Sequence, residues 1–148
     1  AILGAFMIGY PFDGFKTVES MPRFILENGI DAFNLTHLTP FPGTRLYKRL
    51  ETEQRITHVN YPEDWSLYNF SNVVYRHENL EKNELTAIVD AIKKRLVAPV
   101  KMLVYRFLRT LFLTRSLSSA FVALTWNLGV RKAFLRGLKA RKTDKNTV

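Results

Sequence analysis

The distribution of apolar and polar residues predicts a strand, a helix and a second strand within the first 38 residues. Residues 2–9 form a nearly continuous apolar run, which is typical of a strand covered on both faces. Residues 17–28 repeat apolar side chains at helical spacing, with Pro22 as an interruption, and the Asn-Gly pair at 28–29 favours a helix end. Residues 32–38 alternate as a second strand. Together these elements predict a βαβ unit with a right-handed crossover.

The alternation within the second strand separates its side chains into two sets. One face carries three residues that we expect to pack on helices or in the structural core: Phe33, Leu35 and His37. The opposite face carries Asn34, Thr36 and Leu38. Polar side chains on a covered face of a sheet need hydrogen-bond partners, so Asn34 and Thr36 bond either to one another or to a ligand.

The stretch after the second strand is predicted to begin with a turn and a helix. Residues 40–44 read Pro-Phe-Pro-Gly-Thr, and a Pro-Gly pair suits the centre of a type II turn. Thr44 can cap a helix that begins at Arg45. Residues 56–79 are punctuated by Asn and Pro and are predicted to be irregular, with one short strand candidate at 72–77.

The remainder of the chain is predicted to be helical. Apolar residues recur at helical spacing from residue 80 onward, and two later helices are expected at 99–114 and 117–138. Residues 139–148 are polar and are predicted to be a disordered basic tail. The chain is thus divided into an α/β part at 1–79, a helical extension at 80–138 and this tail.

The formal charge differs sharply between the two parts of the chain. Residues 1–100 contain 11 Lys or Arg and 12 Asp or Glu, whereas residues 101–148 contain 11 and 1. The chain has no cysteine, which excludes disulfides, thiolate metal sites and an iron–sulfur cluster ligated by this chain alone. The absence of cysteine is compatible with a reducing cytoplasm, and a cytoplasmic location is our expectation.

Two strings of residues resemble the radical S-adenosylmethionine (radical SAM) family. Residues 4–13, Gly-Ala-Phe-Met-Ile-Gly-Tyr-Pro-Phe-Asp, resemble the fifth strand of its barrel, and residues 37–47 resemble the sixth strand and the loop after it. In the subgroup with an N-terminal cobalamin-binding domain, that loop commonly reads Thr-Pro-aromatic-Pro-Gly-Thr, as residues 39–44 do here. Shorter pieces at 28–31, 64–68 and 73–75 follow in the same order. The resemblance covers residues 1–95, departs at Gly14 and is absent from the C-terminal third.

The resemblance implies the last two strand–helix units of a partial TIM barrel, followed by an α-helical C-terminal extension. It also implies a parent enzyme that cleaves S-adenosylmethionine (SAM) reductively at a 4Fe-4S cluster and modifies an unknown substrate by radical chemistry. The cluster ligands, and any cobalamin-binding domain, would lie outside this chain, so the isolated chain is expected to be inactive. Whether cobalamin is used, and whether the outcome is methylation or ring chemistry, stays open.

The candidate site residues stand at or near the carboxyl ends of the two strands, where ligands bind in such sheets. The resemblance implies contacts with SAM from six residues: Phe6, Ile8, Gly9, Thr36, Leu38 and Thr39. Asn34 is the candidate for substrate contact. Phe6 and Ile8 have the alternative of simply filling the core, and His37 is interpreted as structural. Asp13 either orders the loop after the first strand or is solvated, and no metal-ligating residue is expected.

The basic C-terminal helices leave two interpretations open. Either their apolar faces pack on the barrel and their basic faces are solvated, or they lie on an anionic membrane surface, at the inner face of the membrane. Nucleic acid is disfavoured as a partner, because the basic residues are not interleaved with polar base-reading groups. A rival to the enzyme hypothesis is a small basic module that docks on a membrane or a protein, but it leaves the string at 39–44 unexplained. The expected partners are otherwise the rest of the barrel and a small-molecule or lipid-like substrate.

Overall fold

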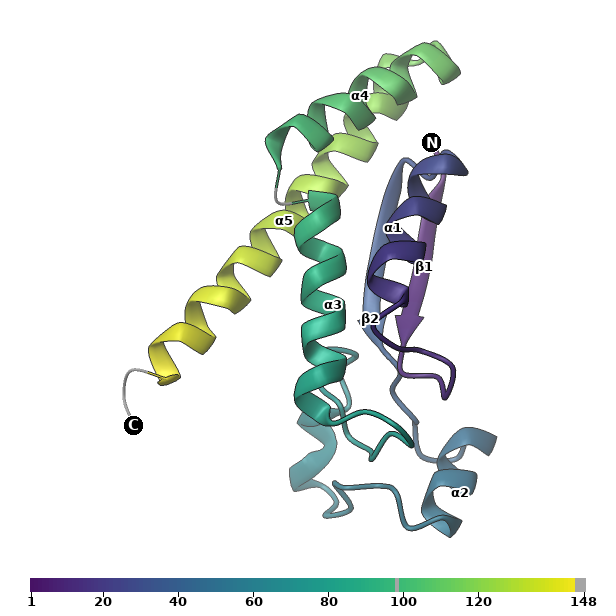
Figure 1. Cartoon of the computed structure of the whole chain (residues 1–148), viewed down its shortest axis with the longest axis vertical. Coiled ribbons are helices and arrows are strands. Elements are labelled where there is room, and N and C mark those ends of the chain that lie inside the picture. The colour runs from purple at the N-terminus through teal and green to yellow at the C-terminus, as the bar shows by residue number, and fades with distance from the viewer. Residues whose placement is uncertain (98, 146–148) are drawn as a thin grey trace. The chain divides into compact units, whose positions relative to one another are not determined.

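The computed structural model describes residues 1–97 and 99–145 and has an α/β fold, as predicted. Within these residues, two strands, five α-helices and a short 3-10 helix follow one another along the chain (Figure 1). Their order and bounds are β1 (Leu3–Ile8), α1 (Thr17–Glu27), β2 (Ala32–His37), α2 (Arg45–Thr52), η1 (Glu63–Leu67), α3 (Lys82–Val97), α4 (Val100–Thr114) and α5 (Leu117–Lys145).

Strands β1 and β2 pair in parallel, with α1 as the crossover between them. The Ile2 carbonyl accepts a hydrogen bond from Ala32 N at 3.1 Å, and the Ile8 carbonyl accepts one from Leu38 N at 2.8 Å. The offset between donor and acceptor is the same at both ends, so the register is constant along the pair. The sequence prediction of a βαβ unit is therefore confirmed.

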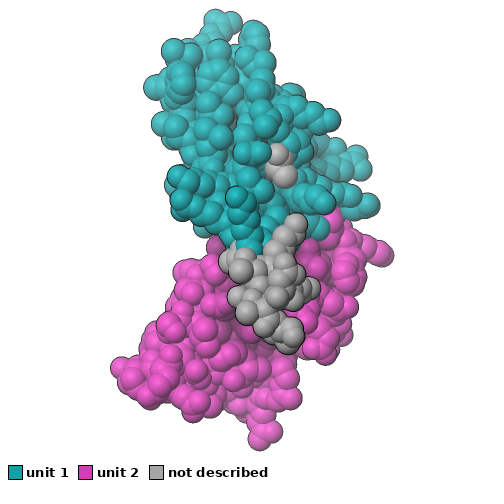
Figure 2. All heavy atoms as spheres, turned by 90° about the vertical axis from the view of Figure 1, so that its left-hand side faces the viewer, with its two compact units in different colours: residues 1–5, 19–34, 90–148 teal, residues 6–18, 35–89 magenta. Residues whose placement is uncertain are grey.

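The chain divides into two compact units, coloured separately in Figure 2. The first comprises residues 1–5, 19–34 and 90–148, and the second comprises residues 6–18 and 35–89. Both strands contribute to both units, because the division cuts each of them near its middle. The α4–α5 hairpin belongs to the first unit, and the loops at the carboxyl ends of the strands belong to the second.

A buried polar cluster organises the first unit around Asp31, which precedes β2. Asp31 is buried, and its carboxylate accepts hydrogen bonds from Ile2 N at 2.7 Å and from the Thr110 hydroxyl. Its backbone carbonyl accepts a bond of 2.8 Å from the Asn127 side chain. Asp31 therefore joins the start of the sheet to both helices of the α4–α5 hairpin.

One predicted strand does not form, and one predicted helix end is misplaced. Residues 72–77 form no strand, and only an isolated antiparallel bridge joins Ile56 to Tyr75, because the turns on either side leave too few residues to extend the pairing. Helix α5 continues to Lys145 instead of ending at 138, so most of the tail predicted as disordered at 139–148 is helical. Lys, Arg and Ala favour helices, and the segment contains neither Gly nor Pro to end one before Lys145. Residues 146–148 lie outside the described residues.

Candidate functional site

Gly9, the first residue after β1, begins a tight loop that Asp13 holds in place. The Asp13 carboxylate accepts hydrogen bonds from Gly9 N at 2.8 Å and from Tyr10 N at 2.9 Å. The Asp13 amide in turn donates to the Tyr10 carbonyl at 2.9 Å. Asp13 is buried. Of the two roles that the sequence left open for Asp13, the structure supports the ordering of this loop.

The other polar group of Gly9, its carbonyl, accepts a hydrogen bond from the Tyr75 hydroxyl. Gly9 has a φ of +131°, and a Cβ atom at this position would lie 2.3 Å from the Tyr75 hydroxyl oxygen. A side chain is thus excluded here both by backbone conformation and by space. Burial raises the pKa of the Tyr75 phenol, and the nearby Asp13 and Tyr10 raise it further against the opposing effect of Arg55. Tyr75 therefore stays a neutral hydrogen-bond donor at physiological pH.

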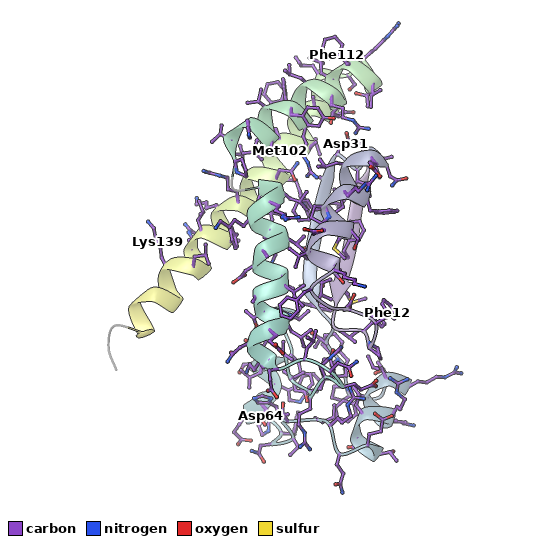
Figure 3. All side chains as sticks on the ribbon, in the orientation of Figure 1. Phe12, Asp31, Asp64, Met102, Phe112 and Lys139 are labelled. Atoms are coloured by element: carbon purple, nitrogen blue, oxygen red, sulfur yellow. The ribbon has the colours of Figure 1, made fainter. Side chains whose placement is uncertain are left out.

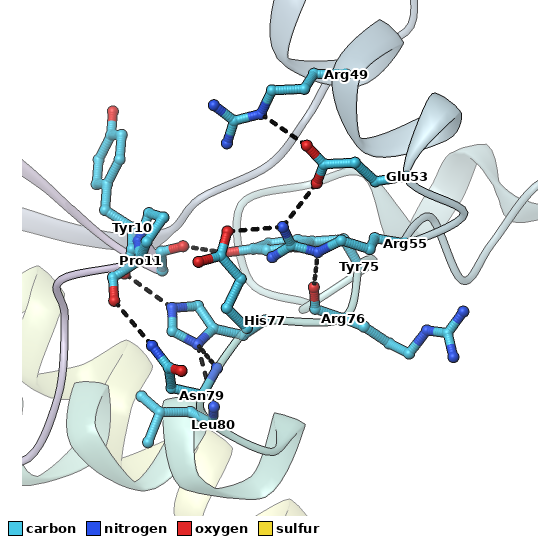
Figure 4. Close-up of polar contacts among 12 residues, drawn as sticks. Tyr10, Pro11, Arg49, Glu53, Arg55, Tyr75, Arg76, His77, Asn79 and Leu80 are labelled. Atoms are coloured by element: carbon cyan, nitrogen blue, oxygen red, sulfur yellow. Dashed lines mark hydrogen bonds and ion pairs between the residues drawn. The ribbon is translucent and has the colours of Figure 1, made fainter.

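The segment after Tyr75 fastens the same loop through two further side chains (Figure 4). The His77 ring accepts hydrogen bonds at Nδ1 from Asn79 N at 3.1 Å and from Leu80 N at 3.2 Å. Because Nδ1 accepts, Nε2 carries the proton and donates to the Tyr10 carbonyl at 2.8 Å. The Asn79 side chain donates to the Pro11 carbonyl at 3.3 Å. The loop after β1 is thus bound by side chains from a segment more than sixty residues away.

Arg55 supports this segment from its other side (Figure 4). Its Nε donates to the Arg76 carbonyl at 2.8 Å, and its Nη1 lies 2.8 Å from a Glu53 oxygen and 2.9 Å from a Glu78 oxygen. Burial alone would lower the pKa of Arg55, but the hydrogen bonds to the two carboxylates outweigh it and the pKa is raised. The guanidinium is therefore a permanent cation that holds residues 53–55 against residues 76–78.

A small cavity of about 160 Å³ opens beside this network. It is lined by Thr57, Val73, Tyr75, Arg76, His77, Leu80, Glu81 and Lys82. At this size it has room for a few water molecules but not for a nucleoside. We do not assign it as the cofactor site.

The two faces of the sheet differ in burial, and this separates the predicted site residues. Ile8 is only 1% exposed and Phe6 is half-buried, while Met7 between them is 43% exposed. Ile8 thus has the burial expected of its alternative role, core filling. Thr36 is half-buried, and its hydroxyl donates to the Phe6 carbonyl at 3.3 Å.

The remaining predicted residues lie along β2 and just beyond it. Leu38 and Thr39 are buried, and the Thr39 hydroxyl donates to the His37 carbonyl at 3.3 Å. His37 is also buried, and its amide donates to the Phe70 carbonyl at 2.9 Å, as a structural role requires. Asn34 is exposed and belongs to the first unit.

Sequence reasoning missed the functions of Tyr75 and His77 in holding the loop after β1. Tyr75 falls in one of the strings that carry the family resemblance, but the string by itself does not indicate what the hydroxyl bonds. The available signal was the glycine at position 9, whose lack of a side chain implies a close neighbour. Nothing local in the sequence identifies that neighbour, which lies 66 residues away.

The structure also limits the kinds of site that the described residues provide. Within residues 1–97 and 99–139, no three His, Cys, Asp or Glu side chains gather closely enough to hold a metal ion. In the same residues, no helix combines the length and the apolar character needed to cross a membrane.

Comparison with known proteins identifies relatives over somewhat more than half of the chain. The chain is 31% identical over 85 residues to bacteriochlorophyllide d C-12(1)-methyltransferase of Chlorobaculum tepidum, covering 57% of this chain and 17% of that protein. It is 29% identical over 80 residues to bacteriochlorophyllide d C-8(2)-methyltransferase of the same organism, covering 54% and 17%. An uncharacterized methyltransferase of Pyrococcus horikoshii is 26% identical over 87 residues, covering 59% and 18%.

All three relatives are named methyltransferases. The chain spans less than a fifth of the length of each of them. No protein-family model matches the chain.

Proposed function

We propose that this chain forms the C-terminal part of a SAM-dependent methyltransferase of the radical SAM family. The observation that carries the proposal is the similarity to three proteins that are each named methyltransferases, over 80 to 87 residues. The ordered strings at residues 4–13 and 37–47 add the family assignment. In this proposal cobalamin, if the enzyme uses it, is held by a domain outside the chain.

The proposed place of β1 and β2 is at the end of a partial TIM barrel. Their parallel pairing across a helical crossover supports this place, since such units build these barrels. The hydrogen bonds that hold the loop after β1 add further support. They fix the edge of the sheet at which barrel enzymes carry their sites, and the Gly9 loop is bound there at both its amide and its carbonyl.

The residues present differ in how well they suit the two expected cofactors. The chain has no cysteine, so it offers no ligand for a 4Fe-4S cluster, and the cluster would be held entirely by residues outside it. For SAM, Met7 and Thr36 provide an accessible apolar surface beside a hydroxyl. SAM, when bound, would supply the methyl group. The chain's own part would be to hold and orient the nucleoside and to exclude water.

The predicted contacts divide in this proposal between direct and supporting residues. Thr36, which is half-buried, and Asn34, which is exposed, remain candidates for direct contact with SAM and substrate respectively. Leu38 and Thr39 are buried and would support the wall from behind. Gly9 would act by positioning, because the Tyr75 hydroxyl occupies the space beside its Cα atom.

The test uses the complete reading frame that encodes residues 1–148 and whatever precedes them. We expect that frame to contain a Cys-x-x-x-Cys-x-x-Cys string, and the anaerobically purified protein to bind SAM in isothermal titration calorimetry. Thr36→Val is expected to weaken SAM binding by about tenfold, since it removes a hydroxyl at the proposed wall. Thr52→Val, at an exposed helix position, is the matched control. A frame without the cysteine string, or a protein that does not bind SAM, would contradict the proposal.

A further inference from the structure

In the α4–α5 hairpin, polar or small residues are buried and large apolar residues are exposed. This is the opposite of the arrangement expected for a helix pair at a protein surface. A surface helix normally turns its apolar stripe toward the core and its polar residues outward. The buried residues of α4 are Leu103, Arg106 and Thr110, of which two are polar. Its outward row at four-residue spacing is apolar, and Leu108 and Phe112 are 45% and 78% exposed.

Helix α5 repeats this reversal in its first half. Its buried residues there are small or polar, namely Ala120, Ala123 and Asn127. Larger apolar residues are exposed instead, with Phe121 at 50% and Val122 at 63%. Small residues between helices and large apolar residues outside them are typical of helices that contact lipid.

Exposed apolar side chains run along both helices of the hairpin and include its turn. Arg115, in the left-handed conformation, ends α4, and α5 begins at Leu117. An edge-to-face contact between Phe107 and Phe121, with ring centroids 5.4 Å apart, joins the two helices about two helical turns from Arg115. Figure 3 shows Phe112 near this end of the hairpin. We define the hairpin tip as six exposed residues: Leu108, Phe112, Leu113, Leu117, Phe121 and Val122.

The sequence of the hairpin and of the residues just before it is uniformly basic. Residues 91–143 contain 13 Lys or Arg and no Asp or Glu. Lys101 and Arg115 are exposed on α4 and at its end, and Lys132 and Arg136 are exposed on α5. Arg115 thus lies at the tip itself, and the other three exposed cations lie farther along the two helices, in a stretch whose sequence contains no acidic residue.

We propose that the hairpin tip inserts into the surface of an anionic membrane while Arg115 and the exposed cations along the two helices contact the lipid headgroups. Helix α4 has 15 residues and is about 22 Å long at 1.5 Å per residue, which is shorter than a bilayer core of about 30 Å. The hairpin would accordingly lie in the interface rather than cross the membrane. A nucleic acid would leave the apolar residues of the tip without contacts, and an acidic protein surface would do the same.

The test is flotation of the chain with vesicles in a density gradient, because aggregated protein sinks and vesicle-bound protein rises. Vesicles of phosphatidylglycerol and phosphatidylcholine are compared with vesicles of phosphatidylcholine alone, at low and high salt. We expect flotation with the anionic vesicles only, and its loss at high salt. The double substitution Phe112→Ser with Leu113→Ser is expected to weaken binding about tenfold or more, since both side chains would leave the lipid. The matched control is Val59→Ser with Tyr61→Ser, which removes comparably exposed apolar groups from the other unit.

A second measurement keeps the proposal testable if the tip variant folds poorly. With Trp65 and Trp126 both replaced by Phe, a Phe112→Trp substitution places the sole tryptophan in the hairpin tip, at a position that is 78% exposed. Its emission is expected to shift to shorter wavelength with anionic vesicles and to be quenched by brominated lipid. The proposal is overturned if the chain does not float, if it floats equally with neutral vesicles, or if tip and control variants behave alike. It is also overturned if the tip substitutions convert a dimer to a monomer without any flotation, since the tip would then be a contact between two copies.

Discussion

The Tyr75 hydroxyl donates a hydrogen bond to the carbonyl oxygen of Gly9, across 66 residues of sequence. The bond joins the end of β1 to the segment that precedes α3, and its acceptor belongs to the loop that Asp13 also holds. Every polar backbone group of Gly9 is thus satisfied by a side chain. A glycine at the end of a strand can look like a site for a ligand, and here another part of the chain fills the space.

Replacing Tyr75 with Phe is expected to destabilise the protein while leaving its packing intact. The substitution removes only the hydroxyl and leaves the buried Gly9 carbonyl without this donor, a loss of about 1–3 kcal/mol. Urea unfolding followed by circular dichroism measures the change. Tyr10→Phe is the control, because Tyr10 is 37% exposed and engages this network through its backbone. Equal stability of the two variants would show that the hydroxyl contributes nothing.

Gly9→Ala is expected to be far more damaging than Gly14→Ala. At Gly9 the new Cβ would lie 2.3 Å from the Tyr75 hydroxyl oxygen and 3.0 Å from Leu38 Cβ, in a backbone conformation with φ of +131°. No atom lies within 4 Å of the corresponding position at Gly14. We expect a loss of roughly 3 kcal/mol or more at Gly9, from strain and overpacking together, and less than about 1 kcal/mol at Gly14. Thermal unfolding of the two variants compares them directly, and similar midpoints would rule out the close approach.

Alkaline pH is expected to destabilise the protein through Tyr68. Burial raises the pKa of Tyr68 to about 12, with smaller contributions from Tyr47 and Asp64, and its hydroxyl donates to the His58 carbonyl at 2.6 Å. An unfolded tyrosine releases its proton near pH 10, earlier than the folded one, so this stabilisation is complete below about pH 10 and is lost as the pH rises toward 12. After allowance for solvent screening, the loss is on the order of 1 kcal/mol.

The measurement for Tyr68 is the urea midpoint at several pH values between 8 and 12. Tyr68→Phe is expected to be less stable at neutral pH by about 1 kcal/mol, because the His58 carbonyl loses a donor, but to show a shallower decline above pH 10. Tyr61→Phe, at a tyrosine that is 77% exposed, should retain the original pH profile. A Tyr68→Phe profile parallel to that of the unsubstituted protein would count against the assignment.

The regular elements were predictable from the sequence because their signals are local. Apolar alternation located β2, and Thr44, whose side chain accepts from Tyr47 N, was recognisable as the cap of α2. The end of α5 was misplaced because polarity was interpreted as disorder, although Lys and Arg are good helix formers. Burial from Phe33 to His37 followed the predicted alternation, with Asn34 exposed and Phe33 buried, but Leu38, which was predicted to share the face of Asn34, is buried.

The arrangement at the candidate site was much less predictable, because it depends on contacts between distant parts of the chain. The role of Gly9 depends on Tyr75, and that of Asp31 depends on Thr110 and Asn127, which follow it by 79 and 96 residues. No periodicity or spacing in the sequence relates these positions. The resemblance to a family located the relevant segments without identifying which side chains hold them together.

Asp31→Ala is expected to destabilise the first unit more than any surface substitution. It removes the acceptor for Ile2 N and the Thr110 hydroxyl, and it leaves the buried cation of Arg106 without the nearby carboxylate. Burial lowers the pKa of Arg106 to about 10, with Asp31 acting in the opposite direction, so the guanidinium is still charged at neutral pH. We expect a loss of roughly 3 kcal/mol, compared with at most about 0.5 kcal/mol for Glu27→Ala at an exposed helix pair.

The coupling between Asp31 and Arg106 can be isolated with a double-mutant cycle. Within the described residues, two nitrogens of Arg106 are buried without a hydrogen-bond partner, and its Cζ lies 5.2 Å from the centre of the Phe33 ring. Arg106→Met retains much of the apolar volume but leaves the buried Asp31 carboxylate without the nearby cation, so by itself it should also destabilise the protein. The loss should be smaller than for Asp31→Ala, because Ile2 N and the Thr110 hydroxyl still donate to that carboxylate. Combined with Asp31→Ala, it should recover at least about 1 kcal/mol of the loss, because no uncompensated charge then remains buried. Urea unfolding of the four proteins at pH 7 gives the coupling energy, and strict additivity would mean that the two charges do not interact.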